Sequence, residues 1–182
     1  MTAPPRLTAA EIARWLGPYD RLLILLCGVL AFALSALRQD WGAALFCGWL
    51  GAATASIVII DLRHFRIPDL LSLPLIPLGL LHTALSQPLW PRLVAMALVW
   101  IGLQLLGRGF RHWRGRTGLG GGDLKLITAA AAWLPPEVLP TYLLCACLTG
   151  LIAAITSRPN HRGVIAFGVH LAPWLVAVVL FG

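Results

Sequence analysis

The chain of 182 residues is 59% hydrophobic and only 12% charged, whereas ordinary soluble domains carry about 25% charged residues. This deficit of charge, together with long apolar runs, excludes a soluble domain and indicates a helical bundle in a lipid bilayer. The net charge of +7 fits the basic inner loops of a membrane protein, so it requires no nucleic-acid partner.

The first residues differ in pattern from the rest of the chain. Residues 1–21 are expected to form a cytoplasmic or interfacial segment, and residues 22–182 a single membrane-embedded domain. The apolar positions of residues 7–16 share one helical face, which is typical of a helix lying on the inner leaflet. Because an acidic flank precedes the first apolar run and further runs follow, we interpret that run as a retained helix and not as a cleaved signal.

The apolar runs predict an all-α, polytopic bundle of about six to seven transmembrane helices. The candidate spans are residues 22–37, 41–60, 70–86, 92–107, 123–134, 138–156 and 164–181. Several are shorter than the ~20 residues that cross ~30 Å of hydrocarbon. The weakest is 123–134, which Pro135 and Pro136 terminate. It is either a half-span or the start of a longer, tilted one.

Loop charge predicts the orientation of these spans. With the N-terminus inside, twelve basic residues fall on the inner side and two on the outer side, a clear positive-inside bias. The inner residues are Arg6, Arg14, Arg21, Arg63, Arg66, Arg108, Arg111, Arg114, Arg116, Lys125, Arg158 and Arg162, and the outer ones are Arg38 and Arg92. Trp41, Trp90 and Trp133 then all lie at the outer boundary, as an aromatic belt would.

Two further patterns have simple interpretations. The run RGFRHWRGR at residues 108–116 interleaves arginine with aromatic side chains, as some RNA-binding patches do. We interpret it as an inner loop that attracts anionic lipid. The cysteines all lie inside apolar runs, without a CxxC pair or a histidine at metal-ligand spacing, so no metal, cofactor or disulfide framework is expected. They are Cys27, Cys47, Cys145 and Cys147.

Only seven acidic residues occur, and four of them are expected to be solvated in terminal or outer positions. These four are Glu11, Asp20, Asp40 and Glu137. Asp61, Asp69 and Asp123 map to the inner face. Asp69 follows a proline and precedes an apolar run, where a helix N-cap belongs.

Asp61 and Asp123 each leave alternatives open. Asp61 ends an apolar run, so it is either an ion-pair partner of Arg63 or Arg66 or a functional carboxylate at membrane depth. Asp123 follows the glycine-rich sequence GLGGG and is either an N-cap or part of a site where a peptide lies against the main chain.

The positions of the two carboxylates are informative together. Asp61 closes one span at the inner face, and Asp123 opens another at the same face after an out-and-back hairpin. Helix packing at 8–10 Å would bring both side chains together. Two adjacent carboxyls that share one proton are able to activate water and polarise a carbonyl, which is the chemistry of peptide hydrolysis without a metal.

The residues that carry this pattern also resemble a known family, the type IV prepilin peptidases of the bacterial inner membrane. The resemblance rests on IDLRHFRIPDLLSLPLIPLGLL (60–81), on GLGGGDLKLITAAAAWL (118–134) and on IAFGVHLAPWL (165–175). It implies that Asp61 and Asp123 are catalytic, with Gly120, Gly122 and Lys125 completing a G-x-G-D-x-K motif. Lys125 is expected to adjust the electrostatics near Asp123.

The resemblance implies a substrate as well. An aspartic endopeptidase of this kind removes the basic leader of prepilins or pseudopilins, after a glycine and before a hydrophobic helix, at the cytoplasmic face. Long members of the family also N-methylate the new terminus and carry an insert with CxxC motifs. Here only RQD separates the first two spans, so methyltransferase activity is not expected. Two prolines usual in the family's tail are replaced by Ala166 and Val169.

Three other functions have less support in the sequence. Another G-x-G-D intramembrane aspartyl protease, of the presenilin kind, lacks support because the chain has no Pro-Ala-Leu motif. A proton-coupled transporter would use the same buried carboxylates as relays, but no internal repeat is evident. An inactive assembly factor is disfavoured because both aspartates are present.

Overall fold

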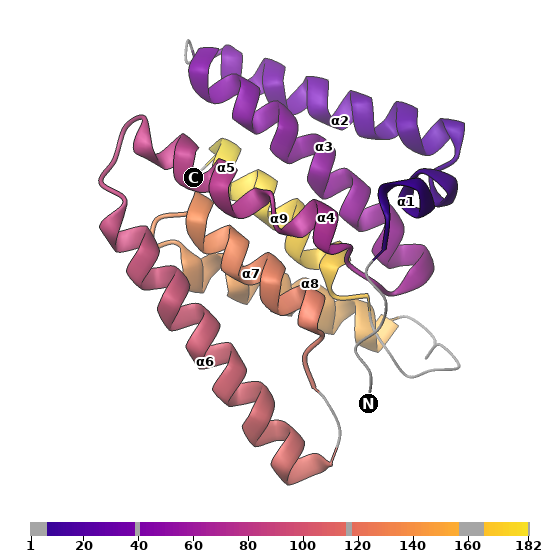
Figure 1. Cartoon of the computed structure of the whole chain (residues 1–182), viewed down its shortest axis with the longest axis vertical. Helices are drawn as coiled ribbons and strands as arrows, with labels where there is room; N and C mark the ends of the chain where they lie inside the picture. Colours follow the sequence, from indigo (N-terminus) through magenta and orange to yellow (C-terminus); the bar gives the residue numbers. More distant parts are fainter. Residues whose placement is uncertain (1–6, 39–40, 116–117, 157–165, 182) are drawn as a thin grey trace.

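The computed structural model describes residues 7–38, 41–115, 118–156 and 166–181, and every regular element in these ranges is an α-helix. The helices are α1 (Ala9–Trp15), α2 (Pro18–Ala36), α3 (Trp41–His64), α4 (Asp69–Ser72), α5 (Leu75–Ala84), α6 (Trp90–Arg114), α7 (Gly121–Trp133), α8 (Leu139–Thr156) and α9 (Gly168–Phe181). In Figure 1, α2 and α3 form an antiparallel pair on one side, α6 lies on the opposite side, and α7, α8 and α9 lie between them. The all-α prediction is confirmed.

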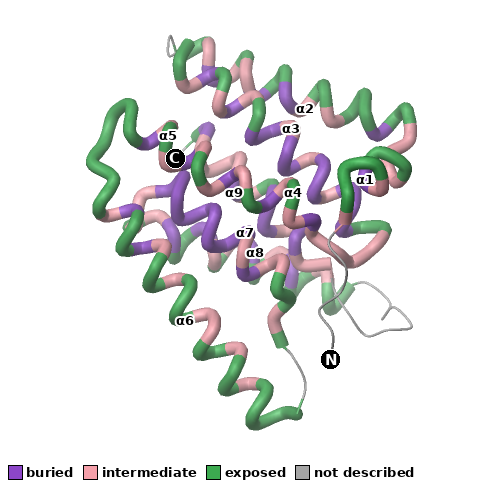
Figure 2. Tube along the Cα trace, in the orientation of Figure 1, coloured by how far each residue is buried: buried purple, intermediate pink, exposed green. Residues whose placement is uncertain are grey.

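Four helices, α2, α3, α6 and α8, are long and apolar enough to cross a bilayer. Their outer faces carry exposed leucine and tryptophan side chains, which appear as the exposed stretches of α2 and α6 in Figure 2. Large apolar side chains on an outer surface are expected where the surrounding solvent is lipid. The prediction of a polytopic membrane protein is confirmed.

The remaining apolar segments are shorter than a span. They are Asp69–Ala84, which contains α4 and α5, and the helices α7 and α9. Helix α7 has 13 residues, which gives it a length of about 20 Å against ~30 Å of hydrocarbon. It is short because Gly120 caps its first turn and Pro135 follows its end, so it matches the half-span alternative.

Several predicted boundaries shift for local reasons. The span predicted at 70–86 is two helices, because Pro74 has no amide hydrogen to continue α4. Helix α6 extends beyond its predicted end to Arg114 and stops where Gly115 takes a left-handed conformation with φ of 69°. Helix α3 continues to His64, so Asp61 lies inside its last turn and not after its end.

Helix α1 forms where the amphipathic pattern predicted it. Thr8 caps its first turn in a capping box with Glu11, in which the Thr8 amide donates to the Glu11 carboxylate at 2.8 Å. These hydrogen bonds from Thr8 hold the pKa of Glu11 below its ordinary value. Glu11 was expected only to be solvated. In the structure it also caps the first turn of α1.

The centre of the molecule is α7, which packs against α5, α6 and α9. Leu126 and the run from Ala129 to Ala132 are fully buried, and Figure 2 shows this stretch of α7 as buried. Alanines keep the helix narrow, so its neighbours approach closely. Small residues also allow α2 and α3 to pack closely, because a Cβ added to Gly51 would lie 2.8 Å from the Cβ of Ala31.

The prediction that Trp133 belongs to an aromatic belt is wrong. Trp133 is buried, and its indole donates a hydrogen bond of 2.8 Å to the carbonyl of Leu75. Its ring also stacks on His82, with ring centroids 5.2 Å apart. Trp133 therefore fastens α7 to α5 and does not face lipid, whereas Trp41 and Trp90 are exposed.

Some predictions concern residues outside the described ranges. They are the solvated Asp40, the basic residues Arg6, Arg116, Arg158 and Arg162, and the beginnings of the 1–21 segment and of the 164–181 span.

Candidate active site

Asp61 lies in the last turn of α3, and its side chain is buried. Its Oδ2 atom has no hydrogen-bond partner in the part of the chain that the structure describes. The backbone amides of Gly168 and Val169, at the start of α9, face the carboxylate. The first amides of a helix attract negative charge, so α9 is oriented to stabilise a carboxylate at this position.

Arg63 is not the counter-ion of Asp61. It forms a bidentate pair with Asp20, through nitrogen–oxygen distances of 2.6 and 2.7 Å. The expectation that Asp20 is solvated is therefore wrong, because its side chain is buried between the start of α2 and the end of α3. Neither of the two salt bridges between described residues includes Asp61, so nothing described neutralises its charge.

The Asp20–Arg63 pair belongs to a set of contacts that fix the end of α3. Asp20 also accepts a hydrogen bond of 2.8 Å from the amide of Gly17. Beside it, the ring of Trp15 stacks on His64 at a centroid distance of 3.9 Å. The corner between α1 and α2 is thus held against the turn of α3 that carries Asp61.

Asp123 is the third residue of α7, and the N-cap of that helix is Gly120. The interpretation of Asp123 as an N-cap is therefore wrong, because the N-cap lies three residues earlier in the chain. Its carboxylate turns back toward the amide of Gly120, and a Cβ added to Gly120 would lie 2.7 Å from its Oδ2 atom. Glycine at 120 leaves the space that this carboxylate occupies.

The structure brings Asp61 and Asp123 together. Asp61 lies close enough for its charge to act on the Asp123 carboxyl, although 62 positions separate the two residues in sequence. Ile67, which follows α3 in the chain, packs against both α7 and α9 beside this site. A Cβ added to Gly122 of α7 would lie 2.8 Å from the Cβ of Ile67, and one added to Gly168 of α9 would lie 2.8 Å from its Cδ1.

The glycines before Asp123 have different roles. The space beside Gly120 and Gly122 is filled by the chain's own Asp123 and Ile67, whereas a Cβ added to Gly121 would have no neighbour within 4 Å. The interpretation that these glycines hold space open beside Asp123 therefore fits Gly121 alone. Gly120 and Gly122, the two positions of the G-x-G-D pattern, are required by close packing inside the protein.

Lys125 and Asp69 form an ion pair between α7 and α4. The Lys125 Nζ atom lies 2.5 Å from Asp69 Oδ1, and about a third of each side chain is exposed. The N-cap of α4 is Pro68, so the capping role expected for Asp69 is wrong. The partner of the Lys125 ammonium is thus Asp69, and not Asp61 or Asp123, the two residues called the dyad below.

We expect the Asp69→Asn substitution to retain most of the catalytic activity. A partly exposed ion pair stabilises a protein by roughly 0–1 kcal/mol, and the ion-pair partner of Asp69 is Lys125, not Asp61 or Asp123. Thermal unfolding in detergent should show a small decrease in stability, with Glu137→Gln, an exposed acid on another loop, as the matched control. A loss of activity as complete as that caused by removing Asp61 would instead place Asp69 inside the reaction.

Three residues of this region escaped prediction from the sequence. Gly168 lies directly against the Asp61 carboxyl, and Ile67 packs between Gly122 and Gly168. Phe65 has a φ of 52°, a left-handed conformation that is uncommon outside glycine. Val169 carries an amide hydrogen, which a proline would lack, and this amide faces Asp61.

The described residues contain no group of three or more histidine, cysteine or acidic side chains that is arranged to hold a metal ion. The cysteines Cys27, Cys47, Cys145 and Cys147 are all free thiols. The site therefore contains the buried carboxyl of Asp61, the partly buried carboxyl of Asp123, the backbone amides at the start of α9, and close contacts at glycines.

Comparisons with known proteins point to one family. Residues 44–155 match the type IV leader peptidase family. The chain is 36% identical to the prepilin leader peptidase/N-methyltransferase of Dickeya chrysanthemi over 159 residues, which cover 84% of the chain and 55% of the relative. The protein of the same name from Neisseria gonorrhoeae is 36% identical over 85% of the chain and 56% of its own length.

A relative of the same name from Burkholderia pseudomallei strain K96243 is 34% identical over 92% of the chain and 56% of its own length. The chain thus spans about half the length of the curated relatives it matches. No solved structure matches it.

Proposed function

The chain belongs to the type IV leader peptidase family, and on that premise we propose that it is a membrane aspartic endopeptidase. Its proposed reaction is removal of the basic leader peptide from type IV prepilins or pseudopilins. The observation that carries the proposal is the convergence of Asp61 and Asp123, from the end of α3 and the start of α7. The side chain of Asp61 is buried there and that of Asp123 is partly buried.

The proposed mechanism uses both carboxyls. Two neighbouring carboxyls hold one proton jointly, because ionising both in a site of low dielectric is unfavourable. The ionised member accepts a proton from water as the water oxygen bonds to the scissile carbonyl carbon. The protonated member donates to the carbonyl oxygen. When the C–N bond then breaks, the carboxyl that took the proton from water passes it to the leaving amine. The other carboxylate takes a proton from a hydroxyl of the tetrahedral intermediate, so the two carboxyls again hold one proton.

The remaining site residues support the dyad in this proposal. The amides of Gly168 and Val169 stabilise the charge on Asp61, and Gly120 leaves space for the Asp123 carboxylate. Lys125 holds α4 to α7 through Asp69. This contact keeps Ile67, which precedes α4, in place beside Gly122.

We place the enzyme in the bacterial inner membrane, with its site facing the cytoplasm. This orientation is supported by basic residues near the dyad end of the bundle, among them Arg63 and Lys125, and by exposed Trp41 and Trp90 at the starts of α3 and α6. Residues 22–182 would act as one peptidase domain, with residues 1–21 on the inner leaflet. The basic end of α6 would attract anionic lipid headgroups.

N-methyltransferase activity is not part of the proposal. The relatives' names include it, but this chain joins its first two spans through three residues, 38–40, and none of its cysteines forms a CxxC pair. A transporter role is not supported, because the matching family consists of peptidases.

We expect the purified chain in detergent to cleave a prepilin-like peptide once, at the end of its basic leader. The products are identified by mass spectrometry, with and without a metal chelator, and with S-adenosylmethionine present. Cleavage that resists the chelator, without a methyl group on the new terminus, agrees with the proposal. An intact peptide would refute the peptidase assignment, cleavage that stops with the chelator would refute the metal-free dyad, and a methylated product would refute the proposed absence of methyl transfer.

A further inference from the structure

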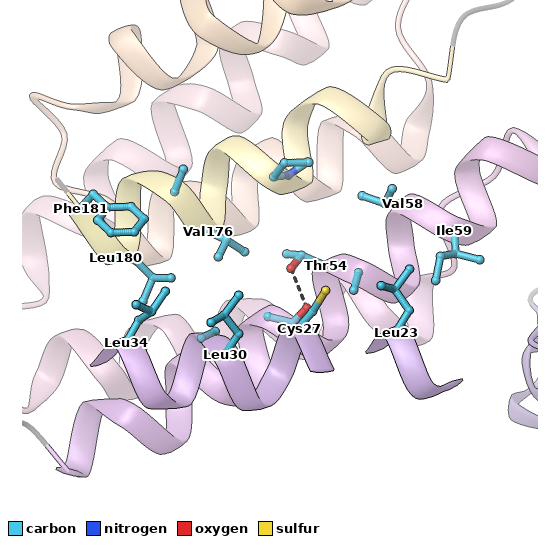
Figure 3. Close-up of a pocket in the computed structure, with 15 residues that line it drawn as sticks. Leu23, Cys27, Leu30, Leu34, Thr54, Val58, Ile59, Val176, Leu180 and Phe181 are labelled. Carbon is cyan, nitrogen blue, oxygen red and sulfur yellow. Dashed lines mark hydrogen bonds between the residues drawn. The ribbon is translucent and has the colours of Figure 1, made fainter. Parts of the chain in front are cut away.

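A groove of about 520 Å³ lies between α2, α3 and α9 (Figure 3). Its lining is apolar, with side chains such as Leu30, Val58, Val176 and Leu180 contributed by all three helices. Of the lining residues only Thr54 carries a hydroxyl, and this hydroxyl already donates to the carbonyl of its own helix at position 50, at 2.7 Å. The groove therefore presents no unsatisfied polar side chain to an occupant.

One end of the groove leads to the dyad. Val58, in its lining, is three residues before Asp61 on α3, which places the carboxylate one turn further along nearly the same face. On α9, Pro173 and Val176 line the groove, and Val169 lies one turn before Pro173 on the same face. Because the Val169 amide faces Asp61, the two helical faces that form the groove meet at the catalytic carboxyl.

We infer that this groove binds the apolar segment that follows the scissile bond of the substrate, as a helix lying along α3 and α9. The inference rests on the proposed function. A lining without free hydrogen-bonding groups does not satisfy an extended backbone, so a chain lying in it must satisfy its own amides, which a helix does. The volume is too small for a whole helix and fits a row of side chains from one helical face.

The position of the groove distinguishes this occupant from a lipid acyl chain. An acyl chain would fill the same apolar space, but it has no reason to be aligned with the dyad. A peptide helix that begins at the scissile bond must lie next to the dyad, and Val58 is only about 4.5 Å from Asp61 along the axis of α3. Leu34 and Phe181 lie at the end of the groove opposite Val58 (Figure 3).

The first test fills the groove. Ala177→Phe places a ring in it, and Ala97→Phe, on the exposed face of α6, is the matched control. Each variant is assayed with a long substrate that keeps an apolar segment of about 20 residues and with a short one that ends soon after the scissile bond. We expect Ala177→Phe to lower kcat/KM for the long substrate about tenfold, through loss of apolar contact, and to leave the short substrate unaffected.

Equal rates for the two phenylalanine variants on the long substrate would overturn the inference while leaving the peptidase function intact. Depletion of co-purified phospholipid by Ala177→Phe, without a change in cleavage, would also overturn it and identify a lipid site. Failure of the unmodified chain to cleave either substrate would count against the proposed function itself, and the second test then still decides the groove.

The second test does not depend on turnover. Cys27 lines the groove beside Gly51, where a Cβ added to the glycine would lie 2.8 Å from the Cys27 carbonyl. Gly51 precedes Asp61 by ten residues, or about 15 Å of helix. A substrate with its only cysteine about ten residues after the scissile bond should therefore form a disulfide with Cys27 in the inactive Asp123→Asn chain.

Cys147, an exposed thiol on α8, supplies the control. In a Cys27→Ser chain that keeps Cys147, the disulfide should disappear. Cross-linking that is equal at both thiols, or absent at Cys27 while the substrate co-elutes with the enzyme, would overturn the inference.

Discussion

Replacing Asp61 or Asp123 with asparagine should abolish cleavage of a prepilin-like peptide. Asparagine keeps the shape of the side chain but neither carries the negative charge nor exchanges the proton, so one half of the dyad is lost. General acid–base catalysis alone contributes about 10²- to 10⁴-fold, and the loss of the shared proton removes both roles at once. We therefore expect activity at or near the background of the assay in each single variant.

The measurement is release of the leader, followed by mass spectrometry, in parallel with circular dichroism and thermal unfolding in detergent. Neither variant should unfold, because neither carboxyl belongs to a salt bridge between described residues, and removing a desolvated charge without a paired cation does not destabilise the fold. Asp69→Asn is the control. Cleavage by either dyad variant at the rate of Asp69→Asn would show that the reaction does not run through these two carboxyls.

The pH dependence follows from the shared proton. The active form holds one proton between the two carboxyls, so activity should decline when acid adds the second proton and again when base removes the first. The profile is therefore expected to be bell-shaped, and its two limbs belong to the pair and not to either residue.

We expect Gly168→Ala to cause the second-largest loss of activity, after the substitutions of Asp61 and Asp123. The new Cβ would lie 2.8 Å from Asp61 Oδ2 and 2.8 Å from Ile67 Cδ1, closer than van der Waals contact allows. Either the carboxylate or the start of α9 must move. A displacement of about 1 Å at a catalytic group costs on the order of 10²-fold in rate, so we expect a fall of that size in kcat.

Gly102→Ala is the matched control, because the same change at that position, inside α6, meets no atom within 4 Å. The control should cleave at the rate of the unmodified chain and unfold at a similar temperature. If Gly168→Ala cleaves as well as Gly102→Ala, the close approach of α9 to Asp61 has no part in the reaction.

Much of this architecture follows from local sequence. A helix forms where an apolar run is long enough and stops where proline or glycine interrupts its hydrogen bonds, so the spans appear close to their predicted ranges. The exceptions are local too: Pro74 divides one predicted span, and Gly115 ends another only after an arginine-rich turn. The two aspartates are likewise evident from the sequence, because a carboxylate at the end of an apolar run is costly without a purpose.

The partners of the charged and aromatic side chains were not predictable in this way. Arg63 is near Asp61 in sequence, yet it pairs with Asp20, and Trp133 resembles a belt residue, yet it is buried against α5. Each choice depends on which helices lie side by side. A sequence window contains no information on that arrangement, since it results from packing among segments far apart in the chain.

The sequence by itself therefore determined an all-helical membrane protein and two acidic residues at the ends of two of its helices. Only the tertiary structure decided that the first amides of α9 face Asp61, that Ile67 packs against Gly122, and that an apolar groove forms between α2, α3 and α9. The physical reason is the distance along the chain over which each kind of interaction acts. Helix formation depends on hydrogen bonds four residues apart, whereas a site assembled from α3, α7 and α9 depends on close packing between surfaces that come together only in the folded chain.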